Sequence, residues 1–225
     1  VGVEDQIDRA GWGSFQTLAY IAAFFFVVSD GMELIVTNVT FRAMPLEKWG
    51  MNDTHRGYLI SASFTGFVVG GLLGGFFGDQ FGRRTMLFVH TAVFLPFTIC
   101  SGLSQNLETL MFSRLVVGLS LGIVLPTVIS YFSELCPTSL RGRAIGSLPM
   151  IGFTSGEVLV LLVGLLFMRL YGEQDCGQDG CDWWRWMMVA GVVPDLLAVS
   201  LVFFLLPESP RFLLAQGRRE EAEKA

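Results

Sequence analysis

The sequence predicts an all-α membrane protein with six transmembrane helices. Hydrophobic residues make up 52% of the 225 residues and charged residues only 16%, whereas soluble domains carry about 25% charged residues. Six apolar runs approach the roughly 20 residues that a membrane-spanning helix needs, and none shows the period of two that is typical of a strand. The 20 Phe and 26 Gly residues are typical of helices packed together in lipid.

Each of the six predicted spans is bounded by polar, Gly-containing or Pro-containing residues. The spans are residues 18–39, 58–77, 86–103, 107–132, 144–167 and 186–206. Residues 1–17 and 207–225 are expected to be cytoplasmic segments at the two ends. The chain lacks an initiator Met and ends in what reads as an unfinished helix, so we expect it to be a fragment.

The distribution of basic residues predicts that both ends of the chain are cytoplasmic. With the N-terminus inside, nine of the 15 Lys and Arg residues fall in inner segments and five in outer loops, as the positive-inside rule requires. Asn52 begins a glycosylation sequon in an outer loop. Cys176 and Cys181 lie in another outer loop, where a disulfide and two free thiols are both compatible with the sequence. The expected location is an integral multi-pass protein of the plasma membrane or a vesicle membrane.

Glycines at helical spacing predict close contacts between spans. The second span carries them at every fourth residue: Gly66, Gly70, Gly74 and Gly78. The fourth span carries Gly118 and Gly122, and the fifth carries Gly152 and Gly156. Lipid gives helices no hydrophobic reason to associate, so close approach depends on small residues of this kind. The stripes indicate either tight static packing or smooth faces that slide during a conformational change.

Five charged residues fall inside the predicted spans. They are Asp30, Glu33, Arg114, Glu157 and Asp195. Each costs about 2.5–3.5 kcal/mol at the centre of a bilayer on insertion scales. We therefore expect these side chains to face a water-filled cavity, to pair with one another, or to bind a ligand.

Asp30 and Glu33 are the strongest candidates for a substrate or proton site. Their i, i+3 spacing places both carboxylates on one helix face, where repulsion favours a proton on one of them. A structural pair bonded to neighbouring helices is the alternative. Arg114 could neutralise such an acid or hold a substrate carboxylate. Glu157 could be a second proton or cation site, or a structural acid.

The remaining polar residues give no support to an enzyme. Asp195 follows Pro194 and is expected to satisfy backbone groups that the proline frees. His90 is expected to be a packed, hydrogen-bonded residue. The sequence has no metal-ligand cluster, no phosphate-binding glycine loop and no nucleophile motif, so we expect no metal and no cofactor. The net charge of −5 argues against a nucleic-acid partner.

The loop after the second span resembles the signature loop of the major facilitator superfamily. It runs from Gly75 through Asp79, Gly82 and Arg83 to Arg84, with Gln80 where the superfamily has a basic residue. Three further segments are similar to superfamily motifs in the same order: Arg114-x-x-x-Gly118-x-x-x-Gly122, Tyr131-x-x-Glu134-x-x-Pro137-x-x-x-Arg141-Gly142, and Pro207-Glu208-Ser209-Pro210-Arg211.

Other residues point to a subgroup of this superfamily. The segments Asp30-Gly-Met-Glu33 and Gly156-Glu157-Val158-Leu159 look most like those of synaptic-vesicle-related and organic cation or anion transporters. Asp30-Gly-x-Glu33 also resembles a motif of aromatic acid–proton symporters. The fifth span lacks the Gln-Gln-Leu signature of sugar porters, although the other motifs are of the sugar-porter type.

The resemblance implies that this chain is the six-helix N-terminal half of a twelve-helix transporter. The half would contain two inverted three-helix repeats, divided between residues 103 and 107, and its partner would be a C-terminal six-helix half. Substrate would bind near the midplane between the halves. An inner gate would be formed by eight motif residues: Asp79, Gly82, Arg83, Arg84, Glu134, Arg141, Glu208 and Arg211.

The function that follows is secondary active transport of a small organic solute, expected to be an organic ion, coupled to protons through Asp30 and Glu33. Facilitated uniport of a sugar-like solute is one alternative. A non-transporting membrane receptor or binding protein on the same scaffold is another, and a purely structural six-helix assembly is a third. The partners expected are the solute, protons and the lipid bilayer.

Overall fold

The computed structural model describes residues 7–9, 11–45, 47–171 and 182–224, and in this part of the chain every regular element is helical. The long helices are α2 (Ser14–Thr40), α3 (Asp53–Phe81), α4 (Arg83–Leu103), α5 (Leu107–Leu135), α6 (Thr138–Tyr171) and the pair α7 (Trp183–Ala190) and α8 (Val192–Leu205). Short helices follow α2 (η1, Phe41–Ala43) and α8 (α9, Pro210–Ala215, and α10, Arg219–Lys224). Cys176 and Cys181 lie outside the described residues.

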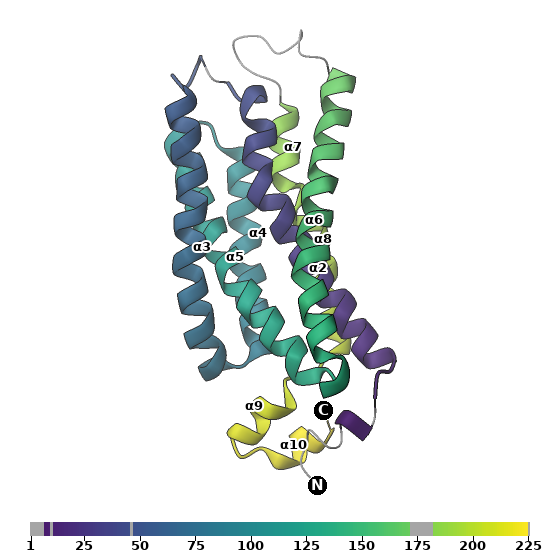
Figure 1. Cartoon of the computed structure of the whole chain (residues 1–225). Coiled ribbons are helices and arrows are strands. Elements are labelled where there is room, and N and C mark those ends of the chain that lie inside the picture. Colours follow the sequence, from purple (N-terminus) through teal and green to yellow (C-terminus); the bar gives the residue numbers. More distant parts are fainter. Residues whose placement is uncertain (1–6, 10, 46, 172–181, 225) are drawn as a thin grey trace.

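Six helical segments are long and apolar enough to cross a membrane, which confirms the predicted fold class. They form an upright bundle, and α9 and α10 lie below it, at the end where α2 begins (Figure 1). Most of the helices continue past the predicted apolar spans, because polar residues at helix ends extend the hydrogen-bonded backbone beyond the apolar part.

The sixth span differs from the prediction because it is broken into α7 and α8 at Gly191. Pro194 lies in the first turn of α8; it has no backbone N–H, and its ring crowds the carbonyl four residues earlier. The Gly191 carbonyl at the break accepts a hydrogen bond from Ser29 Oγ, 2.7 Å away on α2. Thus α2 satisfies a backbone group at the break.

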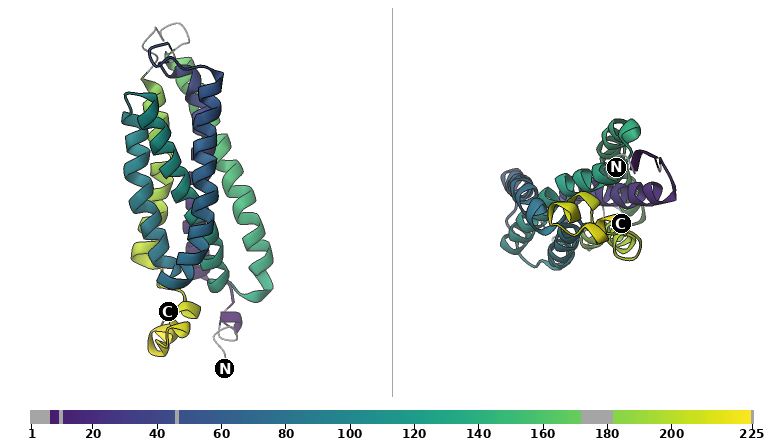
Figure 2. Two further views of the ribbon diagram at one scale, coloured as in Figure 1. Left: turned by 90° about the vertical axis from the view of Figure 1, so that its left-hand side faces the viewer. Right: turned by 90° about the horizontal axis from the view of Figure 1, so that it is seen from below.

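The two central helices are α2 and α5, and the outer helices are α3 and α6. In the apolar windows of α2 and α5 most residues are buried, whereas in those of α3 and α6 only 22% are. Figure 2 shows the bundle from two further sides. Helix α3 packs along α5 and α6 packs along α2; likewise α4 packs along α5 and α8 along α2. If α2, α3 and α4 are matched with α5, α6 and α8, the α3–α5 pair corresponds to the α6–α2 pair and the α4–α5 pair corresponds to the α8–α2 pair. This is the pattern expected for two three-helix repeats.

Glycines bring the paired helices into backbone contact. A Cβ added to Gly66 of α3 would lie 2.0 Å from the Leu115 carbonyl oxygen of α5. In the other pair, a Cβ on Gly156 of α6 would lie 2.2 Å from the Val28 carbonyl oxygen of α2. The predicted stripe is shorter than expected, because a Cβ on Gly78 would meet nothing within 4 Å. Both interfaces therefore depend on glycine at their centres.

Candidate functional site

Five charged or titratable side chains from four helices meet inside the bundle. This central cluster consists of Asp30 and Glu33 from α2, His90 from α4, Arg114 from α5 and Asp195 from α8. Each residue is at most 3% exposed. The expectation that intramembrane charges pair with one another therefore holds for most of the cluster, and the contacts divide it into two pairs and one remaining acid.

The first pair joins the two central helices. Arg114 Nη1 lies 2.7 Å from Glu33 Oε2, and Arg114 Nε donates to Ser101 Oγ of α4 at 3.1 Å. A hydrogen-bonded pair of opposite charges is the form in which a protein core tolerates ions. The pairing of Arg114 with an acid of the first span, which chemistry alone made plausible, is thus present.

The second pair joins α4 to α8. His90 Nε2 lies 2.9 Å from Asp195 Oδ1, and His90 Nδ1 lies 2.8 Å from the Ser120 carbonyl oxygen of α5. His90 is therefore the packed, hydrogen-bonded residue that we expected. The expectation for Asp195 was wrong: the hydrogen-bond partner of its carboxyl is His90, and the Gly191 carbonyl at the α7–α8 break accepts from Ser29.

Asp30 is the acid that remains without a partner. Neither of its carboxylate oxygens has a hydrogen-bond partner in the part of the chain that the structure describes, although the side chain is 0% exposed. The Asp195 and Glu33 carboxyls both lie near enough to act on it electrostatically. Glu33 Oε1, Arg114 Nη2 and Asp195 Oδ2 are also without hydrogen-bond partners among these residues. The cluster thus contains hydrogen-bond donors and acceptors that have no partner among the described residues.

Glu157, the fourth predicted substrate or proton residue, does not belong to the cluster. It lies on α6, is partly exposed, and has no hydrogen-bond or ion-pair partner among the described residues. Its neighbour Gly156 packs directly on α2. The structure therefore brings together three of the four predicted residues.

A second group of polar residues lies at the end of the bundle where α3 turns into α4. Arg83 donates to Asp79 Oδ1 at 2.8 Å and to Glu134 Oε1 at 3.2 Å, and so connects α3, α4 and α5. Ser209 donates to the other Glu134 oxygen. Glu208 accepts from the Arg84 backbone N–H at 3.1 Å. We call these six residues the end network.

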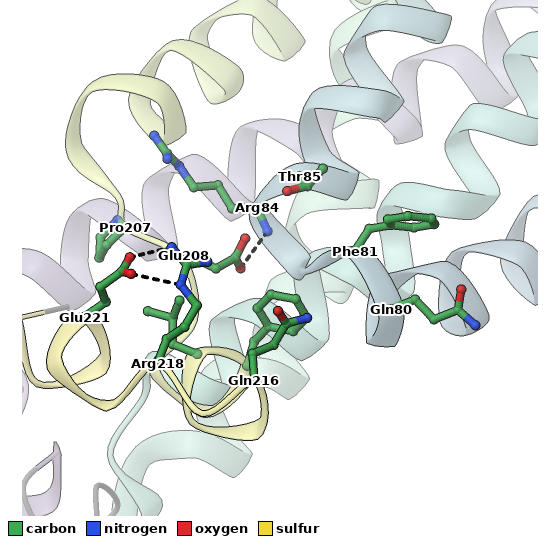
Figure 3. Close-up of a pocket in the computed structure, with 11 residues that line it drawn as sticks. Gln80, Phe81, Arg84, Thr85, Pro207, Glu208, Gln216, Arg218 and Glu221 are labelled. Carbon is green, nitrogen blue, oxygen red and sulfur yellow. Dashed lines mark hydrogen bonds and ion pairs between the residues drawn. The ribbon is translucent and has the colours of Figure 1, made fainter.

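The turn between α3 and α4 fits against this network through Gly82. Its φ of 92° is in the region that favours glycine, and a Cβ there would lie 2.7 Å from Glu208 Oε2. Beside the turn is a pocket of about 660 Å³ between α4 and the α9–α10 segment (Figure 3). Its Arg218 pairs with Glu221, and Gln80 lies apart from these charged groups.

Three predicted gate residues are not among the six residues of the end network: Gly82, described above, Arg141 and Arg211. Arg141 Nη2 donates to the Cys136 carbonyl oxygen at 3.3 Å, and Arg211 is exposed on α9. Sequence reasoning missed Ser209 as a partner of Glu134, although the motif that contains it was recognised. It also missed Tyr131, whose hydroxyl donates to the Pro207 carbonyl oxygen. Both contacts join α5 to the segment after α8, a proximity that no local pattern encodes.

The chemistry available to the central cluster is proton exchange and ion binding. Within the described residues, no three His, Cys, Asp or Glu side chains are grouped so that they could hold a metal ion. A buried carboxyl without a partner favours binding a proton or a cationic group, because an isolated buried charge is costly. An Arg with a free nitrogen can receive an anion.

Comparisons with known proteins agree with this architecture. The family model for the sugar (and other) transporter matches residues 10–225. The chain is 29% identical over 212 residues to the 4-hydroxybenzoate transporter PcaK of Acinetobacter baylyi, covering 94% of this chain and 44% of that protein. It is 34% identical over 176 residues to the arabinose-proton symporter of Bacillus subtilis, covering 78% of this chain and 37% of that protein.

Among solved structures, the proton:xylose symporter XylE bound to 6-bromo-6-deoxy-D-glucose has the same fold, with a TM-score of 0.81 at 23% identity, covering 94% of this chain and 49% of that one. The chain thus spans less than half the length of the curated relatives it matches. Relatives and fold are those of transporters and not of enzymes. The chain therefore belongs to the sugar (and other) transporter family.

Proposed function

We propose that this chain forms the N-terminal half of a proton-coupled symporter for a small organic anion. The observation that carries the proposal is the Asp30 carboxyl, which is buried, has no hydrogen-bond partner among the residues that the structure describes, and is next to the Glu33–Arg114 pair. Protonation of Asp30 removes a buried negative charge. Binding of an anion near Arg114 competes with Glu33 for the guanidinium and favours protonation of Glu33 as well.

Such competition couples the two ligands thermodynamically. A proton on Asp30 or Glu33 makes the cluster less negative and so strengthens anion binding, and the bound anion strengthens proton binding by the same factor. If two conformations of a transporter differ in their affinity for the proton and the anion, a proton gradient would drive the transition between them and so drive transport of the anion.

The identity of the solute is supported by the relatives that cover nearly the whole chain. PcaK of Acinetobacter baylyi and the gallate transporter of Pseudomonas putida are aligned over 94% and 96% of this chain, and both names refer to aromatic carboxylates. A carboxylate is the group that a free Arg114 nitrogen would receive. We therefore propose an aromatic carboxylate as the solute and place the protein among organic-ion transporters.

The end network would serve as the inner gate of this symporter. It ties α3, α4 and α5 to the segment after α8 through partly exposed ionic and hydrogen bonds. Contacts of this kind are made in one conformation and broken in another, and so bias the equilibrium between the two. With the basic residues of the α3–α4 turn at this end, we propose that it is the cytoplasmic end.

Uptake by the full-length protein in liposomes tests the proposal, with radiolabelled 4-hydroxybenzoate as the probe. We expect an inward proton gradient to raise uptake at least tenfold, and we expect Asp30→Asn to abolish this response. Asp53→Asn, which neutralises an exposed acid at the start of α3, is the matched control and should respond like the natural protein. A gradient response that survives in Asp30→Asn would disprove coupling through this residue.

A sugar is the second candidate solute, because the family model and the arabinose-proton symporter both point to sugars. The glucose transporter GlcP of Staphylococcus epidermidis is also 34% identical over 174 residues. Counterflow of radiolabelled D-xylose, D-glucose and 4-hydroxybenzoate in the same liposomes separates the two classes. Exchange of a sugar without exchange of the aromatic acid would replace the organic anion by a sugar.

A further inference from the structure

The His90–Asp195 pair has a hydrogen-bond arrangement that fixes where protons must be. His90 is 0% exposed, and both of its ring nitrogens have oxygen partners. Nδ1 faces the Ser120 carbonyl oxygen at 2.8 Å, and a carbonyl oxygen only accepts. Nδ1 must therefore carry a hydrogen, which leaves Nε2 as the lone-pair nitrogen of a neutral imidazole.

The contact on the other side of the ring then requires a second proton. Nε2 lies 2.9 Å from Asp195 Oδ1. A neutral imidazole and an ionised carboxylate would place two lone pairs against each other at this distance. The contact is favourable only when a proton lies between the atoms, either as imidazolium with carboxylate or as imidazole with carboxylic acid.

The charges that surround the pair favour the same conclusion. From α2 it is faced by Asp30 and, farther along the helix, Glu33; α5 contributes Arg114. Glu157 of α6 is partly exposed and has no contact with it among the described residues. Without added protons, three buried carboxylates would be opposed by Arg114 alone. Two protons are needed to make this buried region neutral, and burial of net charge is costly.

The two protons would bind at two separate positions, one on α2 and one beside it. The His90 ring packs edge-on against Phe26, 5.8 Å between ring centres, and stacks on Phe94 at 5.3 Å. Phe26, Asp30 and Glu33 follow one another on one face of α2. Asp30 therefore lies between the His90–Asp195 pair and the Glu33–Arg114 pair, and one proton on Asp30 leaves the other for His90–Asp195.

We infer that the His90–Asp195 pair is a second proton-binding site of the bundle, distinct from Asp30 and Glu33. The proton itself is required by the contacts described above, and only its use in transport rests on the proposed function. Because the pair joins α4 to α8 while Asp30 lies on α2, any movement of α8 relative to α4 would separate the proton's two partners. Such a movement would change the affinity for this proton.

Spectroscopy on the full-length protein in lipid nanodiscs tests the inference without any substrate. The ¹⁵N signals of labelled histidines are recorded at pH 7, and His90→Gln assigns the His90 signal. Infrared difference spectra between the natural protein and Asp195→Asn detect a protonated Asp195 carboxyl. We expect either an imidazolium signal for His90 that becomes that of a neutral imidazole in Asp195→Asn, or a carboxylic-acid band that is lost in Asp195→Asn.

A neutral His90 imidazole together with an ionised Asp195 at pH 7 would overturn the inference. His55→Gln is the matched control, because His55 lies at the partly exposed start of α3 and, among the described residues, its hydrogen bonds are with Asn52 of the same turn. Removing it should leave both the His90 signal and the Asp195 band in place. Loss of these signals in His55→Gln would also count against a local pair.

Uptake measurements then ask whether the second proton is used. In the liposome uptake assay with radiolabelled 4-hydroxybenzoate, we expect His90→Gln to shift the pH of half-maximal gradient-driven uptake by about one unit, whereas a purely structural role would lower uptake equally at every pH. A gradient response that survives in Asp30→Asn would count against the proposed function and leave the spectroscopic result unchanged. The two failures are therefore distinguishable.

Discussion

The central cluster and the end network both join four segments of the chain through charged side chains, yet they are built in opposite ways. In the end network, both Glu134 oxygens have partners, Arg83 bonds three acceptors, and Asp79 is mostly exposed. In the central cluster every side chain is buried, and Asp30 has no partner among the described residues. The hydrogen-bonded, partly exposed contacts of the end network suit a gate that holds segments together. The buried polar atoms of the central cluster that lack hydrogen bonds suit a site that binds protons and ions.

The sharpest test of this difference is Arg114→Met. The change leaves the Glu33 carboxylate buried without its counter-charge, so we expect the free energy of unfolding to fall by about 3–5 kcal/mol. Thermal melts of the purified protein in detergent measure the effect. Because Glu33→Gln/Arg114→Met removes both charges, this double variant should recover most of the stability. An equally unstable double variant would show that packing, and not charge, is responsible.

Removing an acid from the end network should have a smaller effect. Glu134→Ala leaves Arg83 and Ser209 without one partner each, and such losses cost about 2 kcal/mol in total. The same melts measure the change, and addition of 1 M salt should weaken the natural network as well, since its outer part is exposed. Salt should leave the Arg114→Met difference unchanged. If both regions respond to salt alike, the contrast between them is wrong.

Neutralising Asp30 should act in the opposite direction. Asp30→Asn keeps the shape of the side chain and removes the need to hold a proton or bury a charge, so we expect the free energy of unfolding to rise by about 1 kcal/mol at pH 8. At pH 5, where the natural residue is more easily protonated, the gain should shrink. The same substitution at the exposed Asp79 has no such reason to stabilise, and a gain there would contradict the argument.

The smallest effect concerns Asp8, at the end of the bundle that also holds the end network. Hydrogen bonds from the Thr138 hydroxyl and backbone N–H, both 2.7 Å long, lower the pKa of the Asp8 carboxyl from its ordinary value of 3.8. The contact therefore stabilises the start of α6 above pH 3.8 and is lost as the pH falls through the lowered pKa. Carbon NMR titration measures the midpoint, and Thr138→Val should raise it.

Most of the fold could be predicted from the sequence because span length and apolar composition are local properties. The six-helix class and the glycine contacts of Gly66 and Gly156 follow from residue spacing alone. Pro194 inside the sixth span can kink the helix, but the position of the break at Gly191 was not predicted. Gly78 continues the spacing of the stripe, but a Cβ there would meet no atom within 4 Å, which spacing cannot show.

The residues of the candidate site that the cost of a charge in the membrane singles out could be predicted. The residues whose role depends on a partner from another helix could not. Charges in apolar spans are expensive, and this cost singled out Asp30, Glu33 and Arg114. The cost argument could not separate Glu157, which lies on an outer helix, from the acids of the central helix. His90 and Asp195 are 105 positions apart, so their pairing depends on how α4 packs against α8. The roles assigned to all these residues remain predictions.

The glycine contacts also limit how the molecule can move. A methyl group on Gly66 or Gly156 would overlap a carbonyl oxygen of the facing helix, so α3 rides against α5, and α6 against α2, with backbones already touching. In neither helix pair can the two helices move closer together. In a rocking motion each of these two helix pairs would move as a rigid body. The change in conformation would then be concentrated where helices contact each other through long side chains, or at the break between α7 and α8.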